Sequence, residues 1–200
     1  MQIEQIWLDA ESELLYCPCF LSEALADGLF QTLNTELAWK AEEIKIFGKT
    51  HLQPRLLAWY GDAEAHYSYS GIRHEPLIWT PSLALLKEQL ESCFAVSFNS
   101  VLANKYRNGQ DSMGWHSDDE KELGARPIIA SLSLGAARRF LFRPRKGFEG
   151  VKREFLLAHG SLLLMRGNTQ QNWQHSVPKT AKLTGERINL TFRTIRVTKL

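Results

Sequence analysis

Short stretches with β-strand character follow one another from Val101 to the end of the chain, and turn residues separate each from the next. Glycine recurs between them, as tight turns require. Many short strands at regular spacing favour a sandwich or a barrel. We therefore expect a jelly-roll core, a double-stranded β-helix, over about residues 99–197. The predicted strands are 101–106, 127–134, 138–143, 151–157, 161–165, 172–177 and 187–197.

Two helices are predicted before this core. Ser22 is a suitable N-cap for a helix that runs to about Leu37, with leucine at every fourth position. Thr80 and Pro81 are suitable as N-cap and first helical residue of a second helix. Its apolar stripe is Leu83, Leu86, Leu90 and Phe94. The expected fold class is α+β, a jelly-roll core with an N-terminal helical layer.

Composition limits the class of protein and its partners. The 200 residues suit a single domain, 1–200, and 44% hydrophobic residues fit a globular core. The net charge of +2 creates no strong overall field, so any nucleic-acid binding depends on local patches. The basic residues within 138–153 are one such patch, and a solvated basic loop explains them equally well.

The chain begins without the pattern of a signal peptide, and no apolar run approaches the length of a membrane span. Its three cysteines are an odd number, which favours reduced thiols. We therefore expect a cytoplasmic protein without a membrane partner.

His116 and Asp118 are separated by one residue, and His175 lies in a distant predicted strand. Alternate side chains of an extended strand point to the same side, so His116 and Asp118 are expected to project together. Two histidines and one carboxylate form the facial triad of non-haem Fe(II) oxygenases, which leaves metal positions open for a co-substrate and O₂. The same ligands suit Zn²⁺, so a zinc hydrolase is an alternative.

The last predicted strand has apolar residues on one face and polar residues on the other, namely Arg187, Asn189, Thr191 and Arg193. Asn104 and Tyr106 share a face of the strand before the triad. A half-exposed strand with its polar face in water also explains this alternation. A dicarboxylate that chelates iron through a keto-acid end, however, needs a fixed cation for its far carboxylate, and arginine offers a bidentate fork. A 2-oxoglutarate enzyme is therefore favoured.

Together these motifs resemble the AlkB family of Fe(II)/2-oxoglutarate dioxygenases, which reverse alkylation damage on nucleobases. The resemblance extends from about Ile44 to Ile195. It rests on Asn104-Lys-Tyr106, His116-Ser-Asp118-Asp119-Glu120, Ala158-His-Gly-Ser161, His175-Ser176 and Arg187-Ile-Asn-Leu-Thr-Phe-Arg193. It implies oxidative demethylation of N-alkylated DNA bases, such as 1-methyladenine and 3-methylcytosine, with Fe(II), 2-oxoglutarate and O₂ and with release of formaldehyde and succinate.

The resemblance also implies a role for each site residue. His116, Asp118 and His175 would bind iron and form the catalytic centre. Arg187 would hold the far carboxylate of 2-oxoglutarate, and the rest of that site would be Asn104, Tyr106, Asn189, Thr191 and Arg193. Substrate would be contacted by a nucleotide-recognition lid at about residues 44–75 and by two acidic residues after the first ligands. These residues are Phe47, Arg55, Tyr67, Tyr69, Asp119 and Glu120.

The lid sequence, Ile46-Phe47-Gly48-Lys49 and then Gln53-Pro54-Arg55, resembles the members that repair duplex DNA. There Phe47 would fill the gap left by the flipped base and Tyr69 would stack on that base; a buried strand position explains Phe47 equally well. The stretch 178–182 departs from that group, because it carries only two lysines where those members have a basic cluster.

We expect a monomer that acts on single- or double-stranded alkylated DNA. Three other possibilities are left open by the residues. They are a demethylase that acts on RNA, an oxygenase that acts on a protein side chain, and a nucleic-acid-binding module without catalysis.

Overall fold

A computed structural model describes residues 2–46, 49–69 and 72–196. The strands of its larger sheet are β1 (Glu4–Trp7), β2 (Ser12–Cys17), β3 (Lys40–Ile46), β4 (Lys49–Gly61), β7 (Ser100–Tyr106), β9 (Ile129–Gly135), β12 (Ser161–Gly167) and β14 (Arg187–Arg193). The smaller sheet contains β8 (Met113–His116), β10 (Arg138–Pro144), β11 (Arg153–Leu157) and β13 (Trp173–Val177). A separate hairpin consists of β5 (Tyr67–Tyr69) and β6 (Ile72–His74). The helices are α1 (Glu23–Glu36), α2 (Pro81–Phe94), α3 (Thr169–Asn172) and the 3₁₀ turn η1 (Lys121–Leu123).

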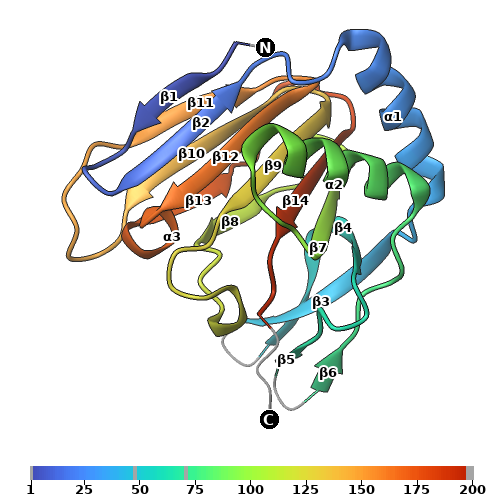
Figure 1. Ribbon diagram of the computed structural model, residues 1–200, viewed down its shortest axis with the longest axis horizontal. Coiled ribbons are helices and arrows are strands. Elements are labelled where there is room, and N and C mark those ends of the chain that lie inside the picture. Colours follow the sequence, from blue (N-terminus) through green and yellow to red (C-terminus); the bar gives the residue numbers. More distant parts are fainter. Residues whose placement is uncertain (1, 47–48, 70–71, 197–200) are drawn as a thin grey trace.

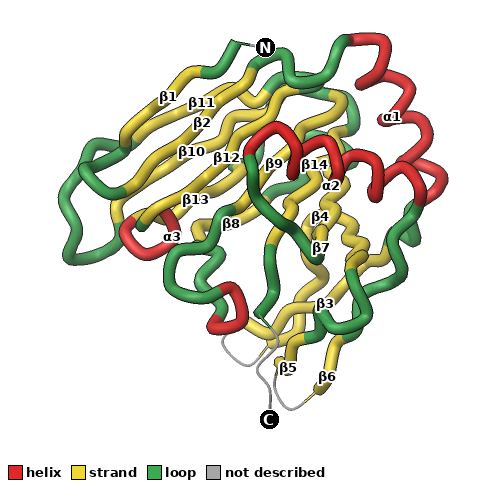
Figure 2. The backbone as a smooth tube through the Cα atoms, viewed as in Figure 1, coloured by secondary structure: helices red, strands yellow, loops and turns green. Residues whose placement is uncertain are grey.

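The two main sheets are antiparallel and face each other (Figures 1 and 2). In the described part of the chain, the larger has the order β1-β2-β12-β9-β14-β7-β4-β3 and the smaller the order β11-β10-β13-β8. Many neighbouring strands, such as β2 and β12 or β7 and β14, are far apart in the sequence, as a jelly roll requires. The predicted jelly-roll core with an N-terminal helical layer is therefore confirmed.

The larger sheet extends beyond the expected core of 99–197, because four strands precede that range. β2 pairs with β12, and β4 pairs with β7, so the region expected to be a lid, 44–75, contains a long strand of the main sheet. Some of these strands pair with a strand that is far away in the sequence; Leu14 of β2, for example, lies opposite Met165 of β12. A pattern within one strand carries no information about such pairing.

Both predicted helices are confirmed. The side chain of Ser22 accepts a hydrogen bond from the Leu25 amide at 3.4 Å, and that of Thr80 accepts one from the Leu83 amide at 3.3 Å. The leucines at every fourth position of α1 do not share one environment, since Leu25 is 48% exposed and Leu33 is buried. A spacing of four residues drifts by about 40° per step around a helix. Ala26, outside this row, is buried together with Leu33.

Among the described residues, no helix combines the length and the apolar character needed to cross a membrane.

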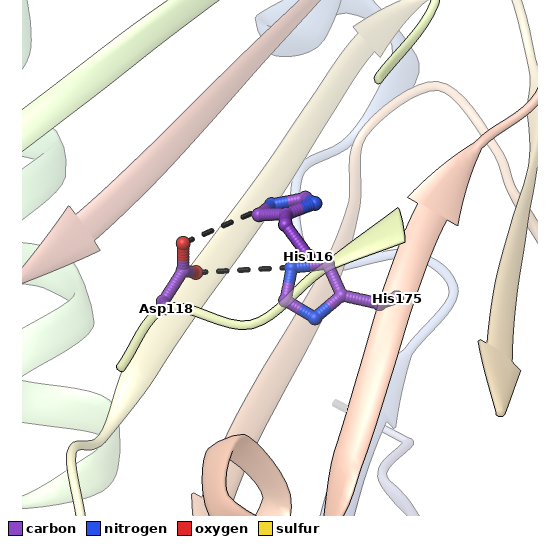
Figure 3. A group of neighbouring side chains, drawn as sticks. All are labelled: His116, Asp118 and His175. Carbon is purple, nitrogen blue, oxygen red and sulfur yellow. Dashed lines mark ion pairs between the residues drawn. The ribbon is translucent and has the colours of Figure 1, made fainter. Parts of the chain in front are cut away.

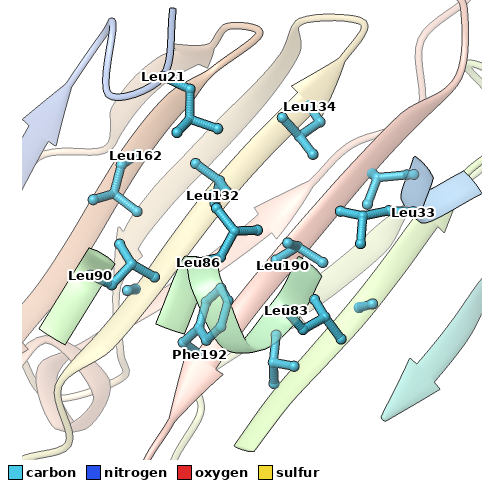
Figure 4. Packing of buried hydrophobic residues seen from close by; sticks show 14 of the residues in the cluster. Leu21, Leu33, Leu83, Leu86, Leu90, Leu132, Leu134, Leu162, Leu190 and Phe192 are labelled. Atoms are coloured by element: carbon cyan, nitrogen blue, oxygen red, sulfur yellow. The ribbon is translucent and has the colours of Figure 1, made fainter. Parts of the chain in front are cut away.

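The central strands of the larger sheet, β9, β12 and β14, are buried on both faces. One face packs against α1 and α2, where Leu132 and Leu190 meet leucines of α2 (Figure 4). The other face turns toward the smaller sheet, and there Ile129 and Leu163 pack against residues such as Phe142. Because side chains of a strand alternate between faces, the polar residues of β14 lie between the two sheets and not in water. A half-exposed β14 is thereby excluded.

Two adjacent leucines of α2 test which face of this helix stabilises the fold. Leu86 is 3% exposed and Leu85 is 67% exposed. We expect Leu86→Ala to lower the free energy of unfolding by about 2–5 kcal/mol, because it leaves a cavity against the sheet. Leu85→Ala, which has the same effect on helix propensity, is expected to change it by less than about 0.5 kcal/mol. Urea unfolding followed by circular dichroism measures both; equal losses would contradict the packing of α2.

Candidate metal centre and co-substrate site

The three predicted metal ligands come together between the sheets (Figure 3). His116, at the end of β8, lies directly opposite His175 on β13 in the antiparallel register. Their ring centroids are 4.2 Å apart. The Asp118 carboxylate lies 3.8 Å from Nε2 of His116 through one oxygen and 3.8 Å from Nε2 of His175 through the other. These gaps exceed a hydrogen bond, and they fit a metal ion that all three side chains share.

The protonation of the ligands also suits a metal. The Gly114 carbonyl lies 2.9 Å from Nδ1 of His116, so Nδ1–H donates there and the Nε2 lone pair faces Asp118. Burial, followed by the proximity of His116, lowers the pKa of His175 to about 3, so this imidazole is neutral at neutral pH. Burial alone raises the pKa of Asp118, but the nearby Arg193 guanidinium, with smaller contributions from His175 and His116, brings it below its usual value. Two imidazoles and a carboxylate are the donor set of the Fe(II) facial triad.

Asp118 was expected to project beside His116 from the same strand, but the structure positions it in another way. It lies beyond the end of β8, and it does not share a strand with His116. Nη2 of Arg193 donates to its carboxylate at 2.6 Å. The backbone N–H of Asp118 donates to the side chain of Gln170 at 2.9 Å. Contacts from β14 and α3 therefore hold the carboxylate near the histidines.

Arg187 is suited to hold an anion. It is 1% exposed, and Nη2 donates to Oγ of Ser133 at 2.9 Å. Its Nε and Nη1 atoms have no hydrogen-bond partner in the residues that the structure describes. Burial lowers the pKa of Arg187 to about 10, so the guanidinium stays charged at neutral pH. A buried cation with unused donors is costly unless an anion completes it, and the far carboxylate of 2-oxoglutarate fits this requirement.

The other predicted co-substrate residues line the cavity that holds the triad. They are Asn104, Tyr106, Asn189, Thr191 and Arg193. Several of them are fixed by hydrogen bonds. Nδ2 of Asn189 donates to Oγ of Ser131 at 2.8 Å, and Oδ1 of Asn104 accepts from Nε of Arg55 at 2.8 Å. Hydrogen bonds therefore fix several polar side chains along the wall of the cavity that holds the metal ligands.

The residues predicted to contact substrate are spread more widely. Glu120 lines a second cavity, next to Arg193, and also a third cavity. Asp119 lines only the third of these and forms an ion pair with Arg145 at 2.6 Å. Arg55 is buried behind Asn104, so it supports the co-substrate pocket. Phe47 lies outside the described residues. Tyr67 and Tyr69 belong to β5, but their side chains also lie outside what the structure describes.

The sequence reasoning missed several residues of the site. Ser131 and Ser133 accept hydrogen bonds from the predicted co-substrate residues Asn189 and Arg187. Two serines in the otherwise apolar strand β9 could have indicated a polar site at this place. Met165, Phe140 and Val177 line the metal cavity, but an apolar residue there cannot be told from core by its pattern. Gln170 gave no signal at all.

Known proteins define the class. The sequence pattern of the 2OG-Fe(II) oxygenase superfamily matches residues 13–193. Alpha-ketoglutarate-dependent dioxygenase alkB homolog 3 of Bos taurus is 47% identical over 192 residues, which cover 92% of this chain and 66% of that protein. DNA oxidative demethylase ALKBH2 of Homo sapiens is 39% identical over 204 residues, which cover 96% of this chain and 78% of that protein. The chain therefore belongs to the AlkB family within the 2OG-Fe(II) oxygenase superfamily.

A solved structure agrees with the fold. The structure of OsALKBH1 has a TM-score of 0.64 with 16% sequence identity, and the similarity covers 96% of this chain and 100% of that chain. This likeness concerns the fold alone. The chain spans about two thirds, 66%, of the length of the bovine relative.

Membership of the superfamily confirms Fe(II), 2-oxoglutarate and O₂ as the predicted cofactors, and the grouping of His116, Asp118 and His175 agrees with it. It also decides against the zinc hydrolase that the ligands alone allowed. The role of each individual residue stays a prediction.

Arg187→Met tests the predicted anion site. Methionine keeps an unbranched side chain but removes the charge and the fork. Because a hydrogen bond to a charged group contributes about 1.5–3 kcal/mol, the affinity for 2-oxoglutarate should fall about 10- to 100-fold. Calorimetry of the Mn²⁺-loaded protein measures it, with Mn²⁺ affinity unchanged. Arg139→Met, at an exposed arginine of β10, is the control. An unchanged 2-oxoglutarate affinity in Arg187→Met would refute the assignment.

Proposed function

We propose that this protein is an oxidative demethylase that removes methyl groups from N-alkylated DNA bases, with 1-methyladenine and 3-methylcytosine as the preferred substrates. The observation that carries the proposal is a cavity of about 170 Å³ beside the metal site, here termed the base cavity. The base cavity and the metal cavity share Arg193. The residues that line the base cavity are Glu42, Trp59, Ser100, Leu102, Glu120, Glu122, Leu123, Arg193 and Ile195.

The charge of the base cavity fits a cationic base. A methyl group on N1 of adenine or N3 of cytosine makes the base positive. Glu42, Glu120 and Glu122 line the cavity, and the one cation among its described lining residues, Arg193, already pairs with Asp118. Desolvation raises the pKa of Glu120, which a positive base would offset by favouring the carboxylate form. Trp59 supplies an aromatic surface of the kind on which bases stack.

The protein's own residues bind and orient the reactants. Bound iron, with 2-oxoglutarate and O₂, would supply the oxidation that converts the N-methyl group to formaldehyde. His116, Asp118 and His175 would hold the metal, and Arg187 would hold the far end of the co-substrate. Asp118, His175 and Arg187 are buried between the two sheets, which limits the access of water to the reacting centre. His116 is partly exposed on the open side of the site.

DNA is the proposed polymer, and the human relative ALKBH2 is named as a DNA demethylase. Part of the basic stretch 138–153 is engaged within the protein. Arg138 is buried and donates to three backbone carbonyls, Arg139 pairs with Glu154, and Arg143 bonds to Gln174. We propose that a monomer recognises the damaged base through the base cavity, in a compartment that contains DNA.

Mass spectrometry of methylated oligonucleotides tests the reaction. The protein is incubated with Fe(II), ascorbate and 2-oxoglutarate, and with 1-methyladenine in single-stranded DNA, duplex DNA or single-stranded RNA. We expect loss of the methyl group from DNA only when 2-oxoglutarate is present. Loss from RNA alone would move the substrate to RNA. Consumption of 2-oxoglutarate without any loss would point to a protein side chain, and no consumption would favour a binding module.

Glu120→Gln tests recognition of the cationic base. Removing this charge should lower kcat/KM for 1-methyladenine about 10-fold or more, because a charge-assisted contact contributes about 1.5–3 kcal/mol. Asp119→Asn should have a smaller effect, since Asp119 does not line the base cavity. Glu88→Gln, on the far side of the larger sheet in α2, is the control. A larger loss in Asp119→Asn than in Glu120→Gln would contradict this assignment.

A further inference from the structure

The segment that carries Asp118 is anchored from outside its own strand. β8 ends at His116, so residues 117–119 lie beyond the ladder of the smaller sheet. Each of the three has another attachment. Oγ of Ser117 donates to the Trp173 carbonyl at 2.8 Å, and the Asp118 amide donates to Oε1 of Gln170 at 2.9 Å. The Asp119 carboxylate accepts from Nη1 of Arg145 at 2.6 Å.

Gln170 is the central anchor. It is 1% exposed, at the second residue of α3. Its Oε1 accepts from the Asp118 amide, and its Nε2 donates to Sδ of Met165 at 3.4 Å. Its own carbonyl accepts from Arg145 at 3.2 Å. Both the oxygen and the nitrogen of the Gln170 side-chain amide have a partner. Because the backbone N–H of Asp118 can donate only to the oxygen, the orientation of this amide group is fixed.

The carboxylate of Asp118 has an anchor of its own. Nη2 of Arg193 donates to Oδ1 at 2.6 Å, and each histidine Nε2 lies 3.8 Å from a carboxylate oxygen. Arg193 therefore fixes the carboxylate from β14, and the Gln170 side chain fixes the backbone behind it from α3. A backbone held from behind keeps both carboxylate oxygens toward the histidines.

We propose that Gln170 is a positioning residue for the metal centre: its amide oxygen holds the Asp118 backbone where the carboxylate can complete the triad. Outer contacts of this kind orient metal ligands, and their loss typically lowers metal affinity by about 10- to 100-fold. The inference concerns metal binding alone. It therefore does not depend on the proposed DNA substrate.

The chain supplies a matched control in the next residue. Gln171 is exposed, and its side chain donates to the Ala125 carbonyl, away from the triad. Gln170→Met keeps the length of the side chain and removes the strong acceptor. Gln170→Glu keeps an acceptor at the same reach. Gln171→Met applies the same chemical change where no metal ligand is contacted.

The measurement is the dissociation constant of Co²⁺ alone, by titration of the full chain, together with the visible absorption spectrum of the bound Co²⁺. Gln170→Met should weaken binding about 10- to 100-fold and change the spectrum. Gln170→Glu should bind more tightly than Gln170→Met, and Gln171→Met should match wild type. Thermal unfolding without metal checks that each variant is folded.

A purely packing role gives a different result. It predicts that Gln170→Met loses thermal stability but binds Co²⁺ with wild-type affinity and spectrum, which would overturn the proposal. Equal weakening in Gln170→Met and Gln170→Glu would do the same, because both change packing and only one removes the acceptor. Should Gln170→Met not fold, Gln170→Glu decides alone: retained Co²⁺ binding supports the proposal, and lost binding in a folded protein refutes it.

Discussion

The burial of the central strands of the larger sheet on both faces is the constraint on which the site depends. In β14, the apolar residues meet the helices, so the alternate residues must point between the sheets. Two of these are arginines, and a buried guanidinium needs an anionic partner. Arg193 finds the metal ligand Asp118, and Arg187 has donors left for a co-substrate. The alternation of one strand thus places both cations of the site.

The smaller sheet contributes the metal ligands to this interior. Antiparallel pairing of β13 with β8 sets His175 directly opposite His116, so two imidazoles approach without help from a loop. Asp118 then comes from outside the ladder and is held by β14 and α3. Residues from both sheets therefore position the metal centre, and a shift of the backbone in either sheet is expected to alter its geometry.

Much of this arrangement could be predicted from local patterns. The caps at Ser22 and Thr80 mark helix starts because a side-chain oxygen replaces a missing backbone partner, and the structure confirms both. The predicted strand 138–143 is nearly the observed β10. Strand β14 ends at Arg193, short of the expected residue 197. Just beyond this end, the Ile195 amide donates a hydrogen bond to the side chain of Asn99. Such a contact between distant residues has no local signal.

By itself the sequence determined the kind of chemistry: two histidines, a carboxylate and a strand with alternating arginines specify a metal and an anion, since these residue types have few other uses together. Only the tertiary structure decided how they meet. Gln170, Ser133 and Arg55 act through partners that are about 50 residues away, Asp118, Arg187 and Asn104. A hydrogen bond depends on distance in space, and distance along the chain does not reveal it.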